Sequence, residues 1–328
     1  MPARPLPLRS VSALRVSPVI GAAGNMYRIG IDLGGTKTEI IVLDEHGQVR
    51  LRRRVPTPRD DYEGTLSTVA SLVREAEAEL GTSATVGVGT PGAVSARTGR
   101  MKNCNSVWLN GRPLREDLEA RLDRPVRIAN DANCLALSEA TDGAGAGAAV
   151  VFAVILGTGT GAGLVVDGRL LTGANAIAGE WGHNPLPWSR EDEHPGPECY
   201  CGRRGCLETW LSGSGLAADH RRMTGQTLDV RTIAARALGG DRDCAATLSR
   251  HEDRLARGLA HVVNILDPQV IVLAGGVSAI PGLYAGVPER WGQYIFSDQV
   301  DTRILPARHG DSSGVRGAAW LWPAAPEA

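Results

Sequence analysis

The architecture follows from one stretch, IGIDLGGTKTE at residues 29–39. A strand-like run at Tyr27–Asp32 leads into two adjacent glycines, and a second apolar run follows at Glu39–Asp44. This pattern predicts a strand, a glycine turn and a second strand. Glycines expose backbone N–H groups that can surround phosphate oxygens, and Asp32 at the strand end is suited to holding Mg²⁺ directly or through water. The turn is a candidate phosphate site, against the alternative of a plain tight hairpin.

The same opening recurs in the second half of the chain. An apolar run at Val150–Leu156 meets the turn Gly157–Gly161, and Leu164–Gly168 follows as a second strand. The spacing between the two copies is far longer than the roughly 20–50 residues of solenoid repeats, so it indicates duplication of a whole lobe. A late strand at 270–273 leads to a further glycine pair, Gly275-Gly276. We expect the glycine turns to face each other across a cleft.

The remaining pattern supplies each lobe with further strands and helices. Strands are expected at 49–55, 85–89, 126–129 and 301–305, and helices at 61–80, 115–122 and 131–141. The predicted organisation is a disordered extension at 1–25, a first lobe at 26–145 and a second lobe at 146–312. A C-terminal helix at 313–323 is expected to pack back on the first lobe. The fold class is therefore α/β with two duplicated lobes.

Composition excludes several classes of protein. The 328 residues include 35 Lys plus Arg against 36 Asp plus Glu, a balance that disfavours a nucleic-acid partner. No apolar run approaches the roughly 20 residues of a membrane helix. Residues 1–25 lack the continuous apolar core of a secretory signal, and six cysteines in this length do not make a disulfide scaffold. We expect a soluble cytoplasmic protein with no membrane or nucleic-acid partner.

Two better-known phosphate motifs do not fit the sequence. Gly30–Gly35 has the spacing of a Walker A loop, but Thr36-Lys37 reverses the Lys-Ser/Thr order of that motif. Gly157–Ala162 matches the GxGxxA dinucleotide fingerprint, yet a strand follows it where that motif requires a helix. The sequence therefore does not favour a dinucleotide-dependent enzyme that transfers hydride.

Three cysteines crowd into one short segment. Cys199, Cys201 and Cys206 form the pattern Cys-x-Cys-Gly-x-x-Gly-Cys, and His183 precedes them. Three thiolates and one imidazole without an open position are typical of structural Zn²⁺. Three buried free cysteines are the alternative interpretation, and His194 is a competing fourth ligand in a polar stretch.

Further candidate ligand-binding residues are carboxylates and an amide. Asn130-Asp131 stands where a strand meets a helix, a position that is also typical of an ordinary helix cap. Glu180 lies three residues before His183, and Glu208 follows the cysteines closely, so a metal there would bring two carboxylates together. Such a group suits a polyhydroxyl ligand.

The chain resembles the ROK family of sugar kinases, within the actin-like ATPase (ribonuclease H-like) fold. The matching blocks are IGIDLGGTKTE from Ile29, VGVGTPGAV from Val86, ANDAN from Ala129, LGTGTGAGLVVDGRLLTGANAIAGEWGH from Leu156 and CYCGRRGCLE from Cys199. Four further blocks, RVPTPRDDY, KNCNSVWLNG, EWGHNPLPW and HGDSSGVRGAAWLWP, look most like bacterial fructokinases of the manno(fructo)kinase type. The resemblance runs from about Met26 to Pro323 and implies two lobes with an active-site cleft between them.

The resemblance also implies roles for individual residues. Asp131 would be the catalytic base that accepts the proton of the sugar 6-hydroxyl, and Asp32 would face Mg²⁺. The sugar would be held by Asn105, Asn130, Asp131, Glu180, His183 and Glu208. The nucleotide site would be lined by Gly34, Gly35, Thr36, Lys37, Thr158, Gly159, Gly275 and Gly276, with Asp32 beside them. Zinc would be bound by His183, Cys199, Cys201 and Cys206.

The implied function is an ATP-dependent hexose kinase that converts D-fructose to fructose 6-phosphate, with mannose as a second substrate and Mg²⁺ and Zn²⁺ as metals. Because members of this family form dimers, the resemblance also implies a homodimer. A glucokinase or an N-acetylhexosamine kinase would share every catalytic residue. A non-catalytic sugar-sensing regulator would keep the pocket without the chemistry. Polyphosphate or another nucleotide in place of ATP stays open.

Overall fold

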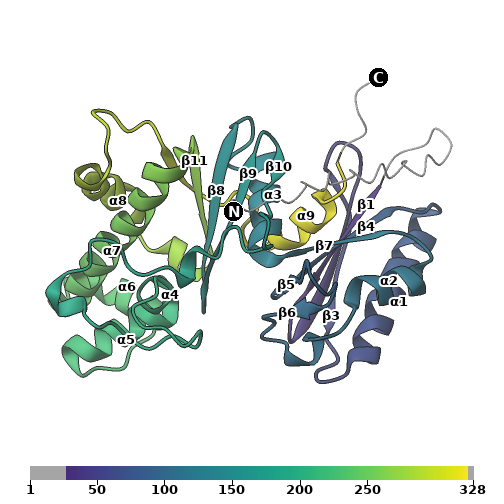
Figure 1. The fold of residues 1–328 in the computed structure, drawn as a ribbon, viewed down its shortest axis with the longest axis horizontal. Helices are drawn as coiled ribbons and strands as arrows, with labels where there is room; N and C mark the ends of the chain where they lie inside the picture. The colour runs from purple at the N-terminus through teal and green to yellow at the C-terminus, as the bar shows by residue number, and fades with distance from the viewer. Residues whose placement is uncertain (1–26, 324–328) are drawn as a thin grey trace, which may run out of the picture.

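The computed structural model describes residues 27–323, so the extension expected at 1–25 lies outside the described residues. Within residues 27–323 the chain forms two five-stranded sheets, with helices between and around them (Figure 1). A short ribbon of β5 (Ala93–Val94) and β6 (Met101–Lys102) is added to the first half. None of the helices in this part of the chain combines the length and apolar character that a membrane span requires.

The first sheet contains β1 (Arg28–Leu33), β2 (Lys37–Leu43), β3 (Val49–Pro56), β4 (Thr85–Thr90) and β7 (Val126–Asn130). Their spatial order is β3-β2-β1-β4-β7, in which β1, β4 and β7 run parallel while β1-β2 and β2-β3 are antiparallel. Helices α1 (Tyr62–Leu80) and α2 (Leu114–Leu122) cover its outer face, where Ile29, Ile31 and Leu33 of β1 are buried. The intervening Gly30 and Asp32 therefore lie on the opposite face.

The second sheet repeats this topology. Its strands are β8 (Val150–Leu156), β9 (Thr160–Val166), β10 (Arg169–Leu170), β11 (Val270–Ala274) and β12 (Arg303–Pro306). Their order is β10-β9-β8-β11-β12, with β8, β11 and β12 parallel and β8-β9 and β9-β10 antiparallel. Strand by strand this is the order of the first sheet, so the predicted duplicated α/β fold is confirmed.

Both glycine turns are shorter than the sequence pattern predicts. β2 begins at Lys37 and not at Glu39, and β9 begins at Thr160 and not at Leu164. The prediction that the second turn extends to Gly161 is wrong, because glycine serves there to make space inside a strand. A Cβ on Gly163 would lie 2.5 Å from the Ala132 carbonyl oxygen, so β9 can approach its neighbouring helix only without side chains.

The outer face of the second sheet is covered by α4 (Glu208–Leu211), α5 (Gly213–Thr224), α6 (Val230–Leu238), α7 (Arg242–Leu266) and α8 (Leu283–Trp291). Buried ion pairs join α7 to the segment that carries the predicted metal ligands: Glu193 accepts from Arg254 at 2.8 Å and from Arg257 at 2.7 Å. Burial alone would raise the pKa of Glu193, but hydrogen bonds from Arg257, the Arg190 backbone and Arg254 lower it to about 2. The segment is thereby anchored to the helix layer.

Two helices lie between the sheets, α3 (Asp131–Thr141) and α9 (Ser313–Trp320) (Figure 1). α9 packs on β1 and β4, and α3 packs on β8 and β9. The two helices touch backbone to backbone, since a Cβ on Gly317 would lie only 1.7 Å from the Cys134 carbonyl oxygen. Their apolar residues form a central core with both sheets, distinct from the two outer cores.

Replacing Gly317 with alanine should destabilise the protein by about 1–3 kcal/mol, the usual cost of forcing extra atoms into a packed interior. By helix propensity alone the same change would stabilise α9 by roughly 1 kcal/mol, so the sign of the effect identifies the contact with α3. Gly292→Ala is the matched control, because a Cβ there meets nothing within 4 Å. Urea unfolding midpoints measure the effect. A midpoint for Gly317→Ala at or above that of wild type would contradict the tight contact.

Candidate active site between the two sheets

The first glycine turn, Gly34–Thr36, follows β1 directly and is held in shape by hydrogen bonds. The Gly34 N–H donates to the Lys37 carbonyl at 3.0 Å, and the Thr57 hydroxyl donates to the Gly34 carbonyl at 2.8 Å. Thr36 and Lys37 are exposed. The turn is therefore rigid at its base, while its tip is accessible to a ligand.

Asp32 stands just before this turn, on the face of β1 that meets α9. A Cβ on Gly314 of α9 would lie 3.9 Å from Asp32 Oδ2. Burial raises the pKa of the Asp32 carboxyl to about 6, and the charges of Asp131 and Glu39 add to the rise. A buried carboxylate with negative neighbours favours a bound cation, which stabilises its ionised form. Asp32 is thus suited to holding a divalent cation beside the turn.

The second glycine turn, Gly157–Gly159, joins β8 to β9 and is held by two neighbouring helices. Glu208, the first residue of α4, accepts the Thr160 backbone N–H through Oε2 at 2.8 Å. The Gly157 carbonyl accepts the N–H of Gly213, the first residue of α5, at 2.8 Å. One oxygen of Glu208 is therefore engaged with the turn, and the resemblance to the family had implied only a sugar contact for this residue.

A cavity of about 510 Å³ opens beside this second turn. Its lining includes Leu156, Thr158, Ser214, Asp229, Val230 and Gly276. Thr158 and Gly276 were expected at the nucleotide. The contributions of α5 and α6 were missed, because helix starts such as Asp229 carry only a capping signal in the sequence. Neighbouring Gly275 has φ +86°, and a Cβ there would lie 2.5 Å from the Leu156 carbonyl oxygen, so the approach of the two loops requires glycine.

Asp131 is the first residue of α3, directly after the carboxyl end of β7. Its Oδ1 accepts the backbone N–H of Ala132 at 2.8 Å, and the residue as a whole is exposed. Burial of the carboxyl group by the surrounding protein raises its pKa, as does the negative charge of Glu180. A substrate can therefore reach the carboxylate, and its basicity exceeds that of an isolated aspartate.

Asn130 is the N-cap of α3. Its Oδ1 accepts the Asn133 N–H at 2.8 Å, so the cap interpretation is correct for this residue. The bond occupies only the oxygen of the amide. The nitrogen can still donate to a ligand, and the cap holds Asn130 and Asp131 in fixed positions at the helix start.

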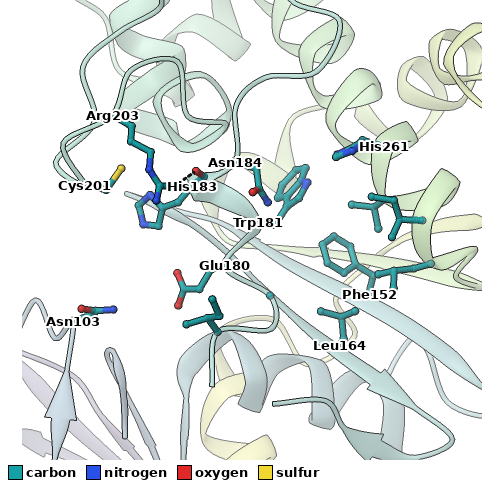
Figure 2. Close-up of a pocket in the computed structure, with 15 residues that line it drawn as sticks. Asn103, Phe152, Leu164, Glu180, Trp181, His183, Asn184, Cys201, Arg203 and His261 are labelled. Carbon is teal, nitrogen blue, oxygen red and sulfur yellow. Dashed lines mark hydrogen bonds between the residues drawn. The ribbon is translucent and has the colours of Figure 1, made fainter. Parts of the chain in front are cut away.

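A second cavity, of about 470 Å³, includes residues from both halves of the molecule (Figure 2). Glu180 and His183 line it together with Asn103, Asn184 and Arg203. Asn105 is not among the described residues that line it; it is exposed, two positions further along the loop that carries Asn103. Asn103 has φ +58°, a left-handed conformation that asparagine tolerates better than most residues, but this is visible only in the structure.

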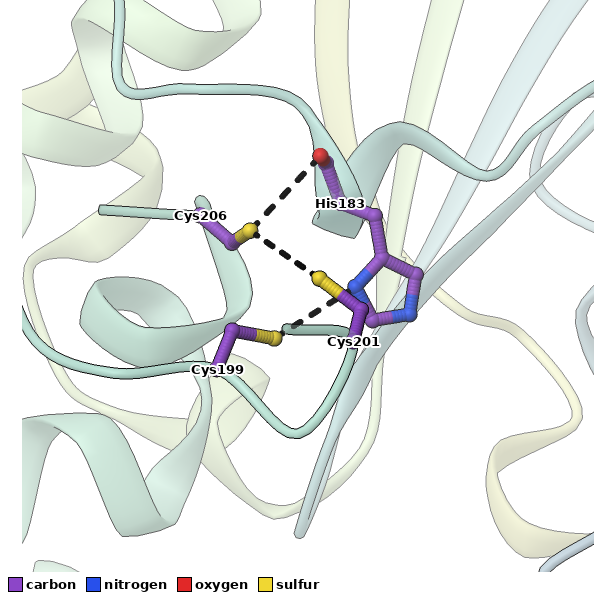
Figure 3. A group of neighbouring side chains, drawn as sticks. All are labelled: His183, Cys199, Cys201 and Cys206. Atoms are coloured by element: carbon purple, nitrogen blue, oxygen red, sulfur yellow. Dashed lines mark hydrogen bonds between the residues drawn. The ribbon is translucent and has the colours of Figure 1, made fainter. Parts of the chain in front are cut away.

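His183 and the three cysteines come together as one group (Figure 3). Their candidate ligand atoms all lie within 4.8 Å of one another, with Cys199 Sγ 3.6 Å from His183 Nδ1 and Cys201 Sγ 3.6 Å from Cys206 Sγ. Four soft donors at these spacings fit a tetrahedral zinc ion. His194 instead pairs with the Ser189 hydroxyl at 2.9 Å. The arrangement therefore favours His183 as the fourth ligand.

The other ring nitrogen of His183 also has a partner. Nε2 lies 3.0 Å from the Tyr200 hydroxyl, and the Tyr200 side chain is exposed. With Nδ1 directed at the cysteines, Nε2 would carry the proton when a metal is bound. His183 can thus combine a metal ligand and a hydrogen-bond donor in one ring.

Comparisons with known proteins agree with this geometry. A sequence model of the ROK family matches residues 28–325. The N-acetyl-D-glucosamine kinase of Escherichia coli O9:H4 (strain HS) is 41% identical over 296 residues, which cover 89% of this chain and 98% of that protein. The ROK hexokinase of Thermus thermophilus has a TM-score of 0.80 and 33% identity, covering 90% of this chain and 97% of that one. A ROK family glucokinase from Streptomyces griseus, solved with glucose and AMPPNP, has a TM-score of 0.71 and 27% identity. The match covers 91% of this chain and 99% of that one.

The family match extends over nearly all the described residues, and the kinase from E. coli is similar along almost its whole length. The two duplicated sheets have the topology of the actin-like ATPase fold that the sequence resemblance implied. The glycine turns, the carboxylates and the cysteine group all lie within the matched region. The chain belongs to the ROK family of sugar kinases.

Proposed function

We propose that the protein transfers the terminal phosphoryl group of ATP to the 6-hydroxyl of a hexose, with Asp131 as general base. The observation that carries this proposal is the position of Asp131. Its accessible carboxylate interacts electrostatically with Asp32 beside the first glycine turn and with Glu180 in the Asn103 cavity. A base between a phosphate turn and a cavity whose wall carries groups that can bind hydroxyls is what phosphoryl transfer to a hydroxyl requires.

The nucleotide is held by the two glycine turns in this proposal. Gly34, Gly35, Thr36 and Lys37 contact the phosphates from the first half, and Thr158, Gly159, Gly275 and Gly276 contact the nucleotide from the second. The cavity beside Thr158 has room for the adenine ring of the nucleotide. Asp32 holds Mg²⁺, which neutralises charge on the phosphates when bound. The chain itself positions the donor, and Asp131 accepts the proton from the attacking hydroxyl.

The sugar lies in the cavity that Asn103, Glu180 and His183 line. Carboxylates and amides suit a polyhydroxyl ligand, because each can pair with one or two hydroxyl groups. We include Asn130 and Asn105 as further contacts, and Glu208 through the oxygen that does not bind the glycine turn. His183, Cys199, Cys201 and Cys206 hold structural zinc, which fixes the ring of His183 at the cavity wall.

N-acetylglucosamine is the sugar that we favour, since the E. coli relative at 41% identity is an N-acetyl-D-glucosamine kinase. The fructokinase subtype expected from the sequence has less support, because none of the three relatives described above carries that name. Fructose stays a second candidate for one reason. Asn103 and Asn184, which line the cavity, belong to blocks that resemble fructokinases. We further propose a cytoplasmic homodimer, which rests on the sequence resemblance.

A coupled ADP-release assay with Mg-ATP measures substrate preference. The sugars compared are N-acetylglucosamine, N-acetylmannosamine, glucose, mannose and fructose. We expect the highest kcat/KM for N-acetylglucosamine. If fructose is highest, the amino-sugar assignment is wrong and the second candidate replaces it. Sugar binding without turnover of any of the five would support a sensing role and overturn the kinase proposal.

Asp131→Asn should lower kcat by about 10²- to 10⁴-fold, the usual contribution of a general base. Sugar affinity should change little, because the amide keeps the shape of the side chain. Asp298→Asn, at an exposed loop position, is the control and should leave both quantities unchanged. Steady-state kinetics and equilibrium sugar binding measure the two effects. If the variant kept a tenth or more of wild-type kcat, Asp131 would not be the base.

Metal analysis of the purified protein should find about one zinc per chain. Cys206→Ser should lose the metal and weaken sugar binding, because His183 would no longer be fixed at the cavity. Cys244→Ser is the matched control, since Cys244 is also buried but lies in α7, outside the cysteine group. A metal-free wild-type protein with full activity would refute the zinc proposal.

A further inference from the structure

Ser106 presents a buried hydroxyl that the proposed function does not use. The residue is 3% exposed, and among the described residues its Oγ has no hydrogen-bond partner. A buried polar atom without a partner costs free energy, so such atoms are uncommon in folded proteins and call for an explanation. A ligand that supplies the missing partner is one explanation.

The Ser106 side chain turns away from its ordinary local role. Ser106 is the N-cap of the short helix Val107–Leu109, where a serine hydroxyl usually accepts a bond from a nearby backbone N–H. Here it makes no such bond, although its carbonyl accepts the Leu109 N–H at 3.0 Å. The hydroxyl lies instead against the first glycine turn. A Cβ on Gly35 would be 2.9 Å from Ser106 Oγ.

The segment that carries Ser106 is fixed from both sides. The Asn110 side chain makes two bonds of 2.9 Å to the backbone N–H and carbonyl of Cys104. Trp108 Nε1 donates to the Thr65 hydroxyl of α1 at 3.3 Å. These contacts hold the segment without help from the Ser106 hydroxyl. Its position beside Gly35 is therefore set by the surrounding chain.

We propose that the Ser106 hydroxyl donates a hydrogen bond to an oxygen of the terminal phosphoryl group of ATP. This inference rests on the proposed function and adds a phosphate contact to it. Its position favours the phosphoryl group over the sugar. The hydroxyl abuts Gly35 of the first glycine turn, which is the proposed phosphate site, and a charged oxygen is the strongest acceptor for such a donor.

Ser106→Ala separates this role from a structural one. With Mg²⁺ present, its affinity for a non-hydrolysable ATP analogue should fall about tenfold or more, the range for a hydrogen bond to a charged group. Its affinity for ADP, which lacks the terminal phosphoryl group, should stay unchanged. Its kcat/KM for ATP should fall by a similar factor, while KM for the sugar stays constant. The thermal unfolding midpoint should not drop, because the variant removes a hydroxyl that has no partner in the protein.

Ser138→Ala is the matched control. Ser138 is also fully buried without a hydrogen-bond partner, but it lies in the middle of α3. Its substitution should leave nucleotide binding unchanged. The proposal is overturned if Ser106→Ala binds the ATP analogue as wild type does, loses ADP affinity to the same extent, raises KM for the sugar, or unfolds at a lower temperature. Failure of the wild-type protein to bind the ATP analogue would instead refute the proposed function itself.

Discussion

The backbone contact between α3 and α9 is the constraint on which the rest of the structure depends. The two helices fill the space between the sheets, and Gly317 lets α9 come within van der Waals distance of the Cys134 carbonyl. α9 packs on the first sheet, and α3 packs on the second. Any increase in the separation of the helices would therefore move one half of the molecule away from the other and open the central core that both sheets share.

This constraint also determines the electrostatics of the site. Asp131 begins α3, and Asp32 lies against α9, so the helix contact sets how closely the two carboxylates approach. Glu180 of the second half adds a third negative charge near Asp131. Burial is the main cause of the raised pKa values of Asp32 and Asp131, and the neighbouring negative charges add to it. A cation and a hydroxyl proton are the two natural partners for such a group.

Sequence reasoning predicted the features that depend on local pattern. The strand, glycine turn and strand units recur in both halves. Asp32 lies near the end of β1 and Asp131 directly follows β7, so chain topology alone brings them to one edge. It failed where three-dimensional packing decides. The start of β9 depends on space for α3, which a glycine in the sequence does not reveal. Asn103 lines the cavity and Asn105 does not, although both are asparagines of the same loop. The contributions of α5 and α6 to the cavity beside the second glycine turn carry no motif.

Glu208 connects the cysteine group to the second glycine turn. It follows Cys206 by two residues, and its Oε2 binds the backbone N–H of Thr160 at the end of the second glycine turn. An ion held by the cysteine group would therefore also restrict the turn that we propose holds the nucleotide. Restricting a shared element couples two ligands, and the coupling is reciprocal. Phosphoryl donor and metal would each tighten the binding of the other, so an abundant donor would protect the ion from competing chelators.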